Sequence, residues 1–203
     1  TCEPCDPLAA IGGCEPDCDL DPTAEGCESE LLPCEGNPIE DPRIAAQTNS
    51  GIAGGRFGMA RNGGTRMHWG LDIQNAPGAS VYAMFGGTVH ATGNQPRGWG
   101  NWVMIRSTVN GKTVDVVYAH TAPAVTGGTV SAGTVIGVSN DSGNLAEAIR
   151  DGDAVPHLHI EVAEVSGSLE WNDRKGTPLH LNPEGVLTTK FESNGDPVPG
   201  TSC

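Results

Sequence analysis

Short runs of β-branched and aromatic residues, separated by tight glycine-containing turns, constrain the fold of this chain more than any other feature. The chain has 203 residues, of which 29 are Gly. Runs over 100–109 and 113–121 flank Asn110-Gly111, a dipeptide that favours a two-residue hairpin turn. Strands spaced this closely and joined by tight turns are typical of antiparallel sheets. The sequence predicts an all-β fold with an antiparallel core, long loops and one short helix over 144–151.

The composition divides the chain into three parts. Residues 1–43 are rich in Cys, Pro and acidic residues, residues 44–190 hold the β-rich runs, and residues 191–203 form an irregular tail. The first part has too few large apolar residues to build a core of its own, so cross-links or docking must hold it. We therefore expect a disulfide-braced irregular segment, one β-rich domain and a C-terminal tail.

The cysteines are confined to the two ends of the chain. Six of the seven lie within the first 34 residues, and the seventh is Cys203. This distribution is typical of a disulfide cluster formed in an oxidising compartment, although it leaves the connectivity and the partner of the odd cysteine open. It predicts a secreted protein, extracellular or periplasmic, whose leader is absent from this chain. Two weaker alternatives are a zinc site that starts at Cys2-x-x-Cys5 and a calcium loop that starts at Asp17, where Pro22 occupies the usual glycine position.

The charge of the chain limits its partners. The formal net charge is −14, whereas nucleic acids and anionic membranes are bound by basic patches. No stretch approaches the roughly 20 consecutive apolar residues that a membrane-spanning helix needs. We therefore expect neither nucleic acid as a partner nor a membrane span.

The stretch "PHLHIEV" at 156–162 places two histidines in a predicted strand. Successive side chains of a strand alternate between its faces, so His157 and His159 share one face and Leu158 and Ile160 the other. From the residues alone, three interpretations stay open. Both histidines bind one metal, one binds while the other transfers protons, or the pair is only the polar face of a half-buried strand.

Three further residues suggest a metal site. His68 and Asp72 lie four apart in "MHWGLDI", and His120 ends the predicted strand "VVYAHT". Imidazole nitrogens and carboxylate oxygens are ligands that zinc accepts, and a catalytic zinc site keeps three protein ligands and one open position. The alternative is that the two histidines are surface residues and that Asp72 caps a turn.

A series of motifs resembles the lysostaphin-like zinc endopeptidases, which cut peptidoglycan peptides. It runs from "GGRFGMAR" through "HWGLDI", "GASVYAMFGGTVHATG", "GNWVMIR", "VVYAHT", "VSAGTVIGVSN" and "PHLHIEV" to "LNPEGVL", in the order of the family, over residues 54–187. The combination of His-x-x-x-Asp, Tyr-Ala-His and His-x-His is specific, whereas each motif alone is weak. The resemblance implies the antiparallel fold of these peptidases and hydrolysis of peptide stems or cross-bridges of bacterial peptidoglycan.

The resemblance also assigns roles to individual residues. It implies that His68, Asp72 and His159 hold one Zn²⁺ ion per chain, and that His120 and His157 stay unligated. The two unligated histidines would deprotonate the attacking water, stabilise the tetrahedral intermediate and pass a proton to the leaving amine. A tetrahedral site filled by four protein ligands would instead be structural.

Three residues are predicted to contact the substrate. Asn101 and Tyr118 match positions that line the groove in the family, although a turn amide and a strand aromatic are equal alternatives. Arg61, in "FG-x-x-R", is expected to hold either a peptide carboxylate or a structural acid. The alternative for the whole chain is an inactive relative that binds peptidoglycan or activates another wall hydrolase.

Two segments depart from the pattern of the family or lie outside it. An insertion at 140–155 leads directly into His157, so we expect it to lie beside the site, where it would narrow the groove, alter the accepted cross-bridge or act as a lid. The segment 1–43 is expected to be either a braced stalk or an autoinhibitory cover. The acidic charge and the lack of a visible wall-binding module make delivery by another machinery as plausible as free secretion.

Overall fold

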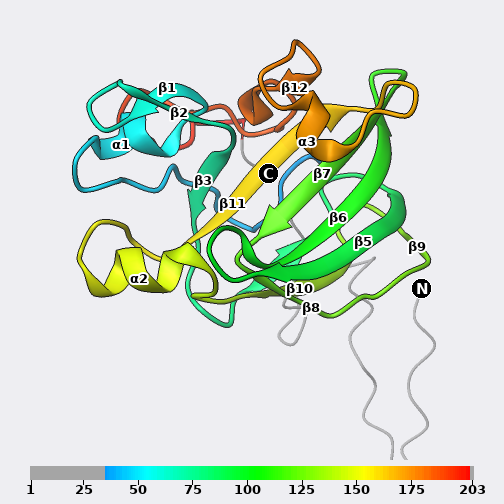
Figure 1. Ribbon diagram of the computed structural model, residues 1–203, viewed down its shortest axis with the longest axis horizontal. Helices are drawn as coiled ribbons and strands as arrows, with labels where there is room; N and C mark the ends of the chain where they lie inside the picture. The colour runs from blue at the N-terminus through cyan, green and yellow to red at the C-terminus, as the bar shows by residue number, and fades with distance from the viewer. Residues whose placement is uncertain (1–34, 202–203) are drawn as a thin grey trace, which may run out of the picture. The chain divides into compact units, whose positions relative to one another are not determined.

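The largest element of the fold is a seven-stranded antiparallel sheet, seen in the computed structural model of the chain (Figure 1). The structure describes residues 35–201. Along the sheet the order is β12-β11-β7-β6-β5-β9, and β3 also pairs with β11. The strands are β3 (Leu71–Gln74), β5 (Gly87–Gln95), β6 (Gly100–Val109), β7 (Lys112–Ala119), β9 (Thr129–Val130), β11 (His157–Glu164) and β12 (His180–Leu181).

Two smaller sheets and four short helical segments complete the fold. Strands β4 (Ser80–Tyr82), β10 (Val135–Ser139) and β8 (Thr121–Pro123) form one small sheet, and β1 (Gly58–Arg61) pairs with β2 (Arg66–His68). The helical segments are α1 (Gly51–Gly55), α2 (Asn144–Arg150), α3 (Trp171–Arg174) and the 3-10 turn η1 (Pro183–Gly185). Every strand pairing of the three sheets is antiparallel, so the predicted all-β fold is confirmed, as is the helix predicted over 144–151.

The hairpin predicted at Asn110-Gly111 is confirmed and joins β6 to β7 in the large sheet. Val109 of β6 pairs with Lys112 of β7, and the two turn residues have φ values of 51° and 76°. Positive φ at both central positions defines the turn type whose twist matches that of the flanking strands. The turn at Gly86-Gly87, between β4 and β5, does not form a hairpin. It joins two different sheets, because β4 pairs with β10 and β5 pairs with β6.

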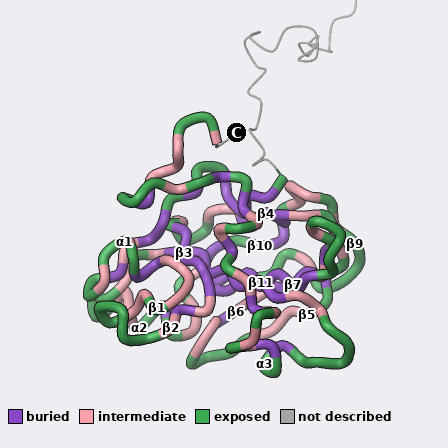
Figure 2. The backbone as a smooth tube through the Cα atoms, turned by 90° about the horizontal axis from the view of Figure 1, so that it is seen from above, coloured by how far each residue is buried: buried purple, intermediate pink, exposed green. Residues whose placement is uncertain are grey.

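The large sheet has one face in the main core and one face that carries polar and aromatic groups. Much of β7 and β11 is buried (Figure 2). On β11, Leu158, Ile160 and Val162 are fully buried in the core, whereas His157 and His159 lie on the opposite face with Glu161 and Ala163. The period-two alternation expected for this strand is therefore present. Core residues from β6, β7 and β11 that share the first face are Val103, Ile105, Val114, Val116, Tyr118, Leu158, Ile160 and Val162.

The described parts of the two terminal segments are bonded to the β-rich region. The backbone N–H of Gly36 donates to the carbonyl oxygen of Met84 at 2.6 Å, and Ile39 is buried. The N–H of Ile44 donates to the carbonyl of Gly195 at 2.9 Å. The division of the chain at 43 and 190 stays a prediction. The cysteine cluster also stays a prediction, because all seven cysteines lie outside the described residues. Within 35–201, no helix is long and apolar enough to cross a membrane.

A buried carboxylate ties β7 to its neighbours on the polar face of the sheet. Asp115 is fully buried and accepts hydrogen bonds from Arg106 of β6, at 2.8 and 3.0 Å, and from Arg174 of α3, at 2.7 Å. Burial alone raises the pKa of Asp115, but the bonds from the two arginines outweigh it and lower the pKa. This stabilisation is present above about pH 4 and is lost as the pH falls through the lowered pKa of Asp115.

Replacing Asp115 should therefore destabilise the fold strongly. We expect Asp115→Asn to lower the free energy of unfolding by about 3 kcal/mol, the low end for breaking a buried ion pair, because the guanidinium of Arg106 stays 36% exposed and can be solvated. Urea denaturation at pH 7 measures the change. The control is Glu147→Gln, which removes an exposed pair with Arg150 and should cost no more than about 0.5 kcal/mol. An equal effect of both variants would contradict the role of Asp115.

Candidate metal centre

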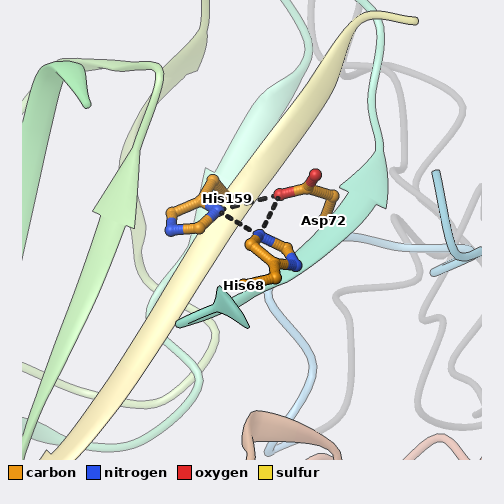
Figure 3. A group of neighbouring side chains, drawn as sticks. All are labelled: His68, Asp72 and His159. Carbon is orange, nitrogen blue, oxygen red and sulfur yellow. Dashed lines mark hydrogen bonds and ion pairs between the residues drawn. The ribbon is translucent and has the colours of Figure 1, made fainter. Parts of the chain in front are cut away.

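The pairing of β3 with β11 brings together residues that lie far apart in the sequence. Its register places Asp72 opposite His159. His68 is the last residue of β2, and two residues separate it from the start of β3. The three side chains point toward one another (Figure 3). The donor atoms of this buried group lie within 4.8 Å of one another, so His68, Asp72 and His159 form a candidate metal centre.

The donor atoms have the spacing that a tetrahedral metal site requires. Oδ1 of Asp72 lies 2.8 Å from Nδ1 of His159 and 3.3 Å from Nε2 of His68, and these two nitrogens are 3.2 Å apart. A tetrahedron with ligand distances of 2.0–2.1 Å has edges of about 3.3 Å. The three residues therefore fit a zinc-sized ion with only a small movement of Asp72 relative to His159.

Groups outside the centre determine which ring nitrogens face it. Nδ1 of His68 donates to the carbonyl oxygen of Arg56 at 2.8 Å, and Nε2 of His159 donates to Oε1 of Glu161 at 3.0 Å. With those nitrogens protonated, Nε2 of His68 and Nδ1 of His159 present lone pairs to the centre. Metal-binding histidines generally have such an outer acceptor, which holds the ring and increases its basicity.

On the side away from His159, Glu161 is held by the indole of Trp99 and the ammonium group of Lys175. Trp99 Nε1 donates to its Oε1 at 2.9 Å, and Lys175 Nζ lies 3.3 Å from its Oε2. Burial raises the pKa of Glu161, but His159, Lys175 and Trp99 outweigh it and lower the pKa to about 2. For His159 the signs are reversed: burial lowers its pKa, but its bonds to Asp72 and Glu161 raise the pKa to about 9. A metal ion must therefore displace a proton from His159 when it binds.

A glycine lets the two ligand-bearing strands approach. A Cβ on Gly70 would lie 2.4 Å from the carbonyl oxygen of Ile160 and 2.5 Å from Cε1 of His159. Both distances are well below van der Waals contact. Any side chain at this position would push the ring of His159 away from Asp72, which explains a glycine between the two ligands of the His-x-x-x-Asp motif.

The second oxygen of Asp72 is bound by residues from the N-terminal side of the motif. Oδ2 accepts hydrogen bonds from Gln47 Nε2 at 3.0 Å and from Arg61, whose Nη2 also lies 2.9 Å from Nε2 of His68. Arg61 was expected to hold either a peptide carboxylate or a structural acid, and the structure supports the second alternative, with Asp72 as the acid. Burial raises the pKa of Asp72, but the surrounding His157, His68 and His159 lower it well below its usual value, so its carboxylate stays charged.

His120 and His157 lie beside the three candidate ligands and are oriented in the same manner. Nδ1 of His120 donates to the carbonyl of Ser142 at 2.9 Å, and Nδ1 of His157 donates to that of Val155 at 2.8 Å. Each ring therefore presents Nε2 as an acceptor, and that of His157 lies 3.5 Å from Oδ1 of Asp72. The centroids of the two rings are 5.3 Å apart. Burial lowers the pKa of both groups, to about 3 for His120, so both rings are neutral near pH 7.

The side chain of His120 reaches this position through an unusual backbone conformation. Strict alternation would place residues 118 and 120 on the same face of the strand. Strand β7 ends at Ala119, however, and His120 has a φ of 55°, in the left-handed region that few non-glycine residues adopt. The turn directs its ring away from the core face, and its backbone N–H donates to Trp99 at 2.8 Å. Such strained residues are concentrated at functional sites.

An open pocket of about 200 Å³ lies over the candidate centre. His68, His120, His157 and His159 line it together with Arg61. The insertion at 140–155 forms one wall of the pocket, which confirms its predicted position beside the site. Residues of the pocket wall that come from the insertion are Asn144, Leu145, Ala148 and Ala154.

Two of the residues predicted to contact substrate lie elsewhere. Tyr118 is fully buried in the main core, and its hydroxyl accepts a hydrogen bond from the N–H of Met84 at 2.8 Å. A position in the substrate groove is therefore contradicted for Tyr118, because it points to the opposite face of β7. Asn101 is half-buried and is not a lining residue of the pocket; its N–H donates to Oγ of Ser142 at 2.8 Å.

Two residues of the site, Glu161 and Gln47, were not predicted from the sequence. Glu161 holds the ring of His159, and Gln47 holds Asp72. The alternation that pairs His157 with His159 also places Glu161 on the same face, so the sequence contained a signal for it. Gln47 comes from a loop before α1, and no sequence pattern connects it to Asp72.

The sequence profile of "Peptidase family M23" matches residues 66–175. No curated protein matches the chain. Among solved structures, the catalytic domain of the antimicrobial peptidase lysostaphin from Staphylococcus simulans is 23% identical, with 64% of this chain and 86% of that chain covered and a TM-score of 0.47.

Two further structures are similar over comparable lengths. A variant catalytic domain of the prophage-encoded M23 protein EnpA from Enterococcus faecalis is 22% identical, with 76% of this chain and 95% of that chain covered and a TM-score of 0.49. A zinc containing peptidase from Vibrio cholerae is 21% identical, with 73% and 38% covered and a TM-score of 0.48. The profile match spans more than half of the chain, including all three candidate ligands, and confirms the resemblance seen in the motifs: the chain belongs to peptidase family M23.

Proposed function

We propose that this M23 peptidase is a zinc-dependent endopeptidase that hydrolyses peptide stems or cross-bridges of bacterial peptidoglycan. The observation that carries the proposal is the convergence of three buried donor atoms with tetrahedral spacing, beside two more histidines whose Nε2 atoms are available. One zinc ion per chain, held by His68, Asp72 and His159, accounts for the spacing and for the outer acceptors of both ligand histidines.

Zinc in this position would act as a Lewis acid: it would polarise the scissile carbonyl and lower the pKa of a bound water toward 7. The protein supplies the proton transfers. His120 and His157 each keep Nδ1 bound to a backbone carbonyl, so each can accept and return a proton only at Nε2. We assign to them removal of a proton from the attacking water, hydrogen bonding to the oxyanion of the tetrahedral intermediate, and donation of the proton to the leaving amine.

Keeping His157 off the metal preserves an open position for the reaction. His68, Asp72, His159 and His157 together would fill a tetrahedral site and leave no place for water or substrate. The candidate ligand atoms that all lie within 4.8 Å of one another are those of His68, Asp72 and His159, and this group does not include His157. The geometry therefore supports His159 as the ligand and His157 as the proton-transfer group.

The substrate class follows from family membership together with the motif resemblance. Peptidoglycan lies outside the cytoplasm, so we expect this chain to act in an extracellular or periplasmic space, in line with the oxidised cysteines predicted for residues 1–34. The competing function is that of an inactive relative that binds peptidoglycan or activates another hydrolase. The presence of all three ligands and both free histidines favours the active enzyme.

Loss of His120 and loss of Asp72 should impair the enzyme in different ways. His120→Ala should keep zinc and lower the release of new amino termini from purified peptidoglycan by about 10²–10⁴-fold, because general acid–base catalysis contributes on that order. Asp72→Ala should lose both zinc and activity. His90→Ala, which changes an exposed histidine bonded to Arg106, is the control and should match the wild type in both measurements. Wild-type activity no greater than that of the two variants would refute the enzymatic function and favour the inactive relative.

Loss of Glu161 should weaken the metal without removing a ligand. We expect Glu161→Ala to lower zinc affinity by about 10–100-fold, the usual effect of removing the outer acceptor of a ligand histidine, and Glu161→Gln to restore part of it through its carbonyl oxygen. Competition with a fluorescent zinc chelator measures both. Glu164→Ala, on the same strand but bonded to Lys112, is the matched control and should bind zinc normally. Unchanged affinity in Glu161→Ala would exclude its role in holding His159.

A further inference from the structure

Beside the catalytic pocket lies a second pocket, of about 340 Å³, that contains three of the four tryptophans of the chain. We call it the tryptophan pocket; the residues that matter here are Trp99, Trp102, Trp171, Asn94, Gln95 and Asn172. It lies on the face of the large sheet that carries His157 and His159, because Trp102 and Met104 point to that face of β6. Trp99 lines both pockets, so the two are adjacent.

The three indole rings are held in place before any ligand binds. Trp99 packs edge-on against Trp102, with centroids 5.9 Å apart, and against Trp171, with centroids 5.8 Å apart. The ring of Trp102 lies directly over Gly93, where a Cβ would be 2.6 Å from Cζ2 of the indole. Trp99 is further held by its bond to Glu161. Rigid aromatic surfaces lose little entropy on binding, so this arrangement is suited to ligand contact rather than only to packing.

Trp99 and Trp102 pack against a small buried cluster that includes Met104 and Trp171, yet both remain only half-buried. Trp171 is more than nine-tenths buried, yet its indole Nε1 has no hydrogen-bond acceptor within residues 35–201. An unpaired buried donor is costly. Because this nitrogen is enclosed by protein, Trp171 supports the other two rings and does not itself offer a hydrogen bond to a ligand.

The polar groups around the rings are neutral. Asn94, Gln95 and Asn172 are exposed amides, and each offers both donors and acceptors. The one cation of the pocket, Lys175, lies 3.3 Å from Glu161 and 5.0 Å from the centroid of Trp99, so its charge is already compensated. Arg174 likewise lies 5.1 Å from the centroid of Trp171, which is itself buried. The pocket therefore presents the half-buried rings of Trp99 and Trp102, bordered by amides, and its lysine is already paired with Glu161.

We propose that the tryptophan pocket binds an N-acetylated sugar ring of the glycan strand while the attached peptide occupies the neighbouring catalytic pocket. A sugar ring has an apolar C–H face that stacks on an indole, and its hydroxyl and acetamido groups match the amide donors and acceptors at the edge. The volume is at the lower end of small-ligand sites, which suits one or two sugar residues. The inference rests on the proposed function, because it takes peptidoglycan as the substrate, and it adds that the enzyme recognises sugar as well as peptide.

A binding experiment tests the inference without requiring catalysis. The trimer of N-acetylglucosamine is titrated into the full chain, and the indole N–H signals of the four tryptophans are followed by nuclear magnetic resonance. We expect saturable shifts of the signals of Trp99, Trp102 and Trp171, whereas Trp69, which lines only the catalytic pocket, serves as the internal control. No shift, or a shift confined to Trp69, would overturn the inference.

A kinetic experiment tests whether the tryptophan pocket contributes to binding of the substrate. For Trp102→Ala, the ratio of kcat/KM on intact peptidoglycan to kcat/KM on a sugar-free cross-linked peptide should fall about tenfold through KM, the loss expected for one aromatic contact. Trp102→Phe keeps an aromatic ring and should restore most of the ratio. An unchanged ratio in Trp102→Ala would refute the inference. If the wild type cuts neither substrate but the trimer still shifts the three signals, the proposed function fails and the sugar site stands.

Discussion

The buried carboxylate of Asp72 is the group on which the arrangement of the site depends. Its neighbours Leu71 and Ile73 are fully buried in the core, so its charge has to be compensated within the protein. Histidines surround one oxygen, and Arg61 and Gln47 bind the other. Because these partners come from separate segments, the carboxylate links the loop before α1, the hairpin β1-β2 and the strand β11. The interactions that fold this corner of the protein are also the interactions that prepare its metal centre.

A single sheet separates packing from chemistry. On β6, β7 and β11, one set of alternating side chains fills the main core, and the other set provides His157, His159, Trp102 and the ion pair between Arg106 and Asp115. The catalytic pocket and the tryptophan pocket are neighbours because both use this second face, and Trp99 borders both. Glu161 connects them physically, since it accepts bonds from His159 on one side and from Trp99 on the other. Glu161 therefore links the tryptophan pocket to the candidate metal centre.

Features that depend on neighbouring residues could be predicted well. The Asn110-Gly111 turn and the shared face of His157 and His159 follow from local backbone geometry, and the structure contains both. Tyr118 was misjudged for a physical reason. It was expected beside His120, but His120 leaves the strand in a left-handed conformation, and the two side chains point to opposite sides. Tyr-Ala-His in the sequence does not reveal that turn.

By itself, the sequence determined the class of fold, the faces of the strands and the chemical types of the candidate ligands, because turn propensity and period-two alternation act over a few residues. The tertiary structure decided which of those side chains meet. Asp72 and His159 are 87 residues apart and touch only because of the register between β3 and β11. The contacts of Gln47 with Asp72 and of Trp99 with Glu161 depend on the same complete sheet. A two-residue turn fixes the register of the β6-β7 hairpin, whereas no turn joins β3 to β11, so no local pattern contains the register of that pair.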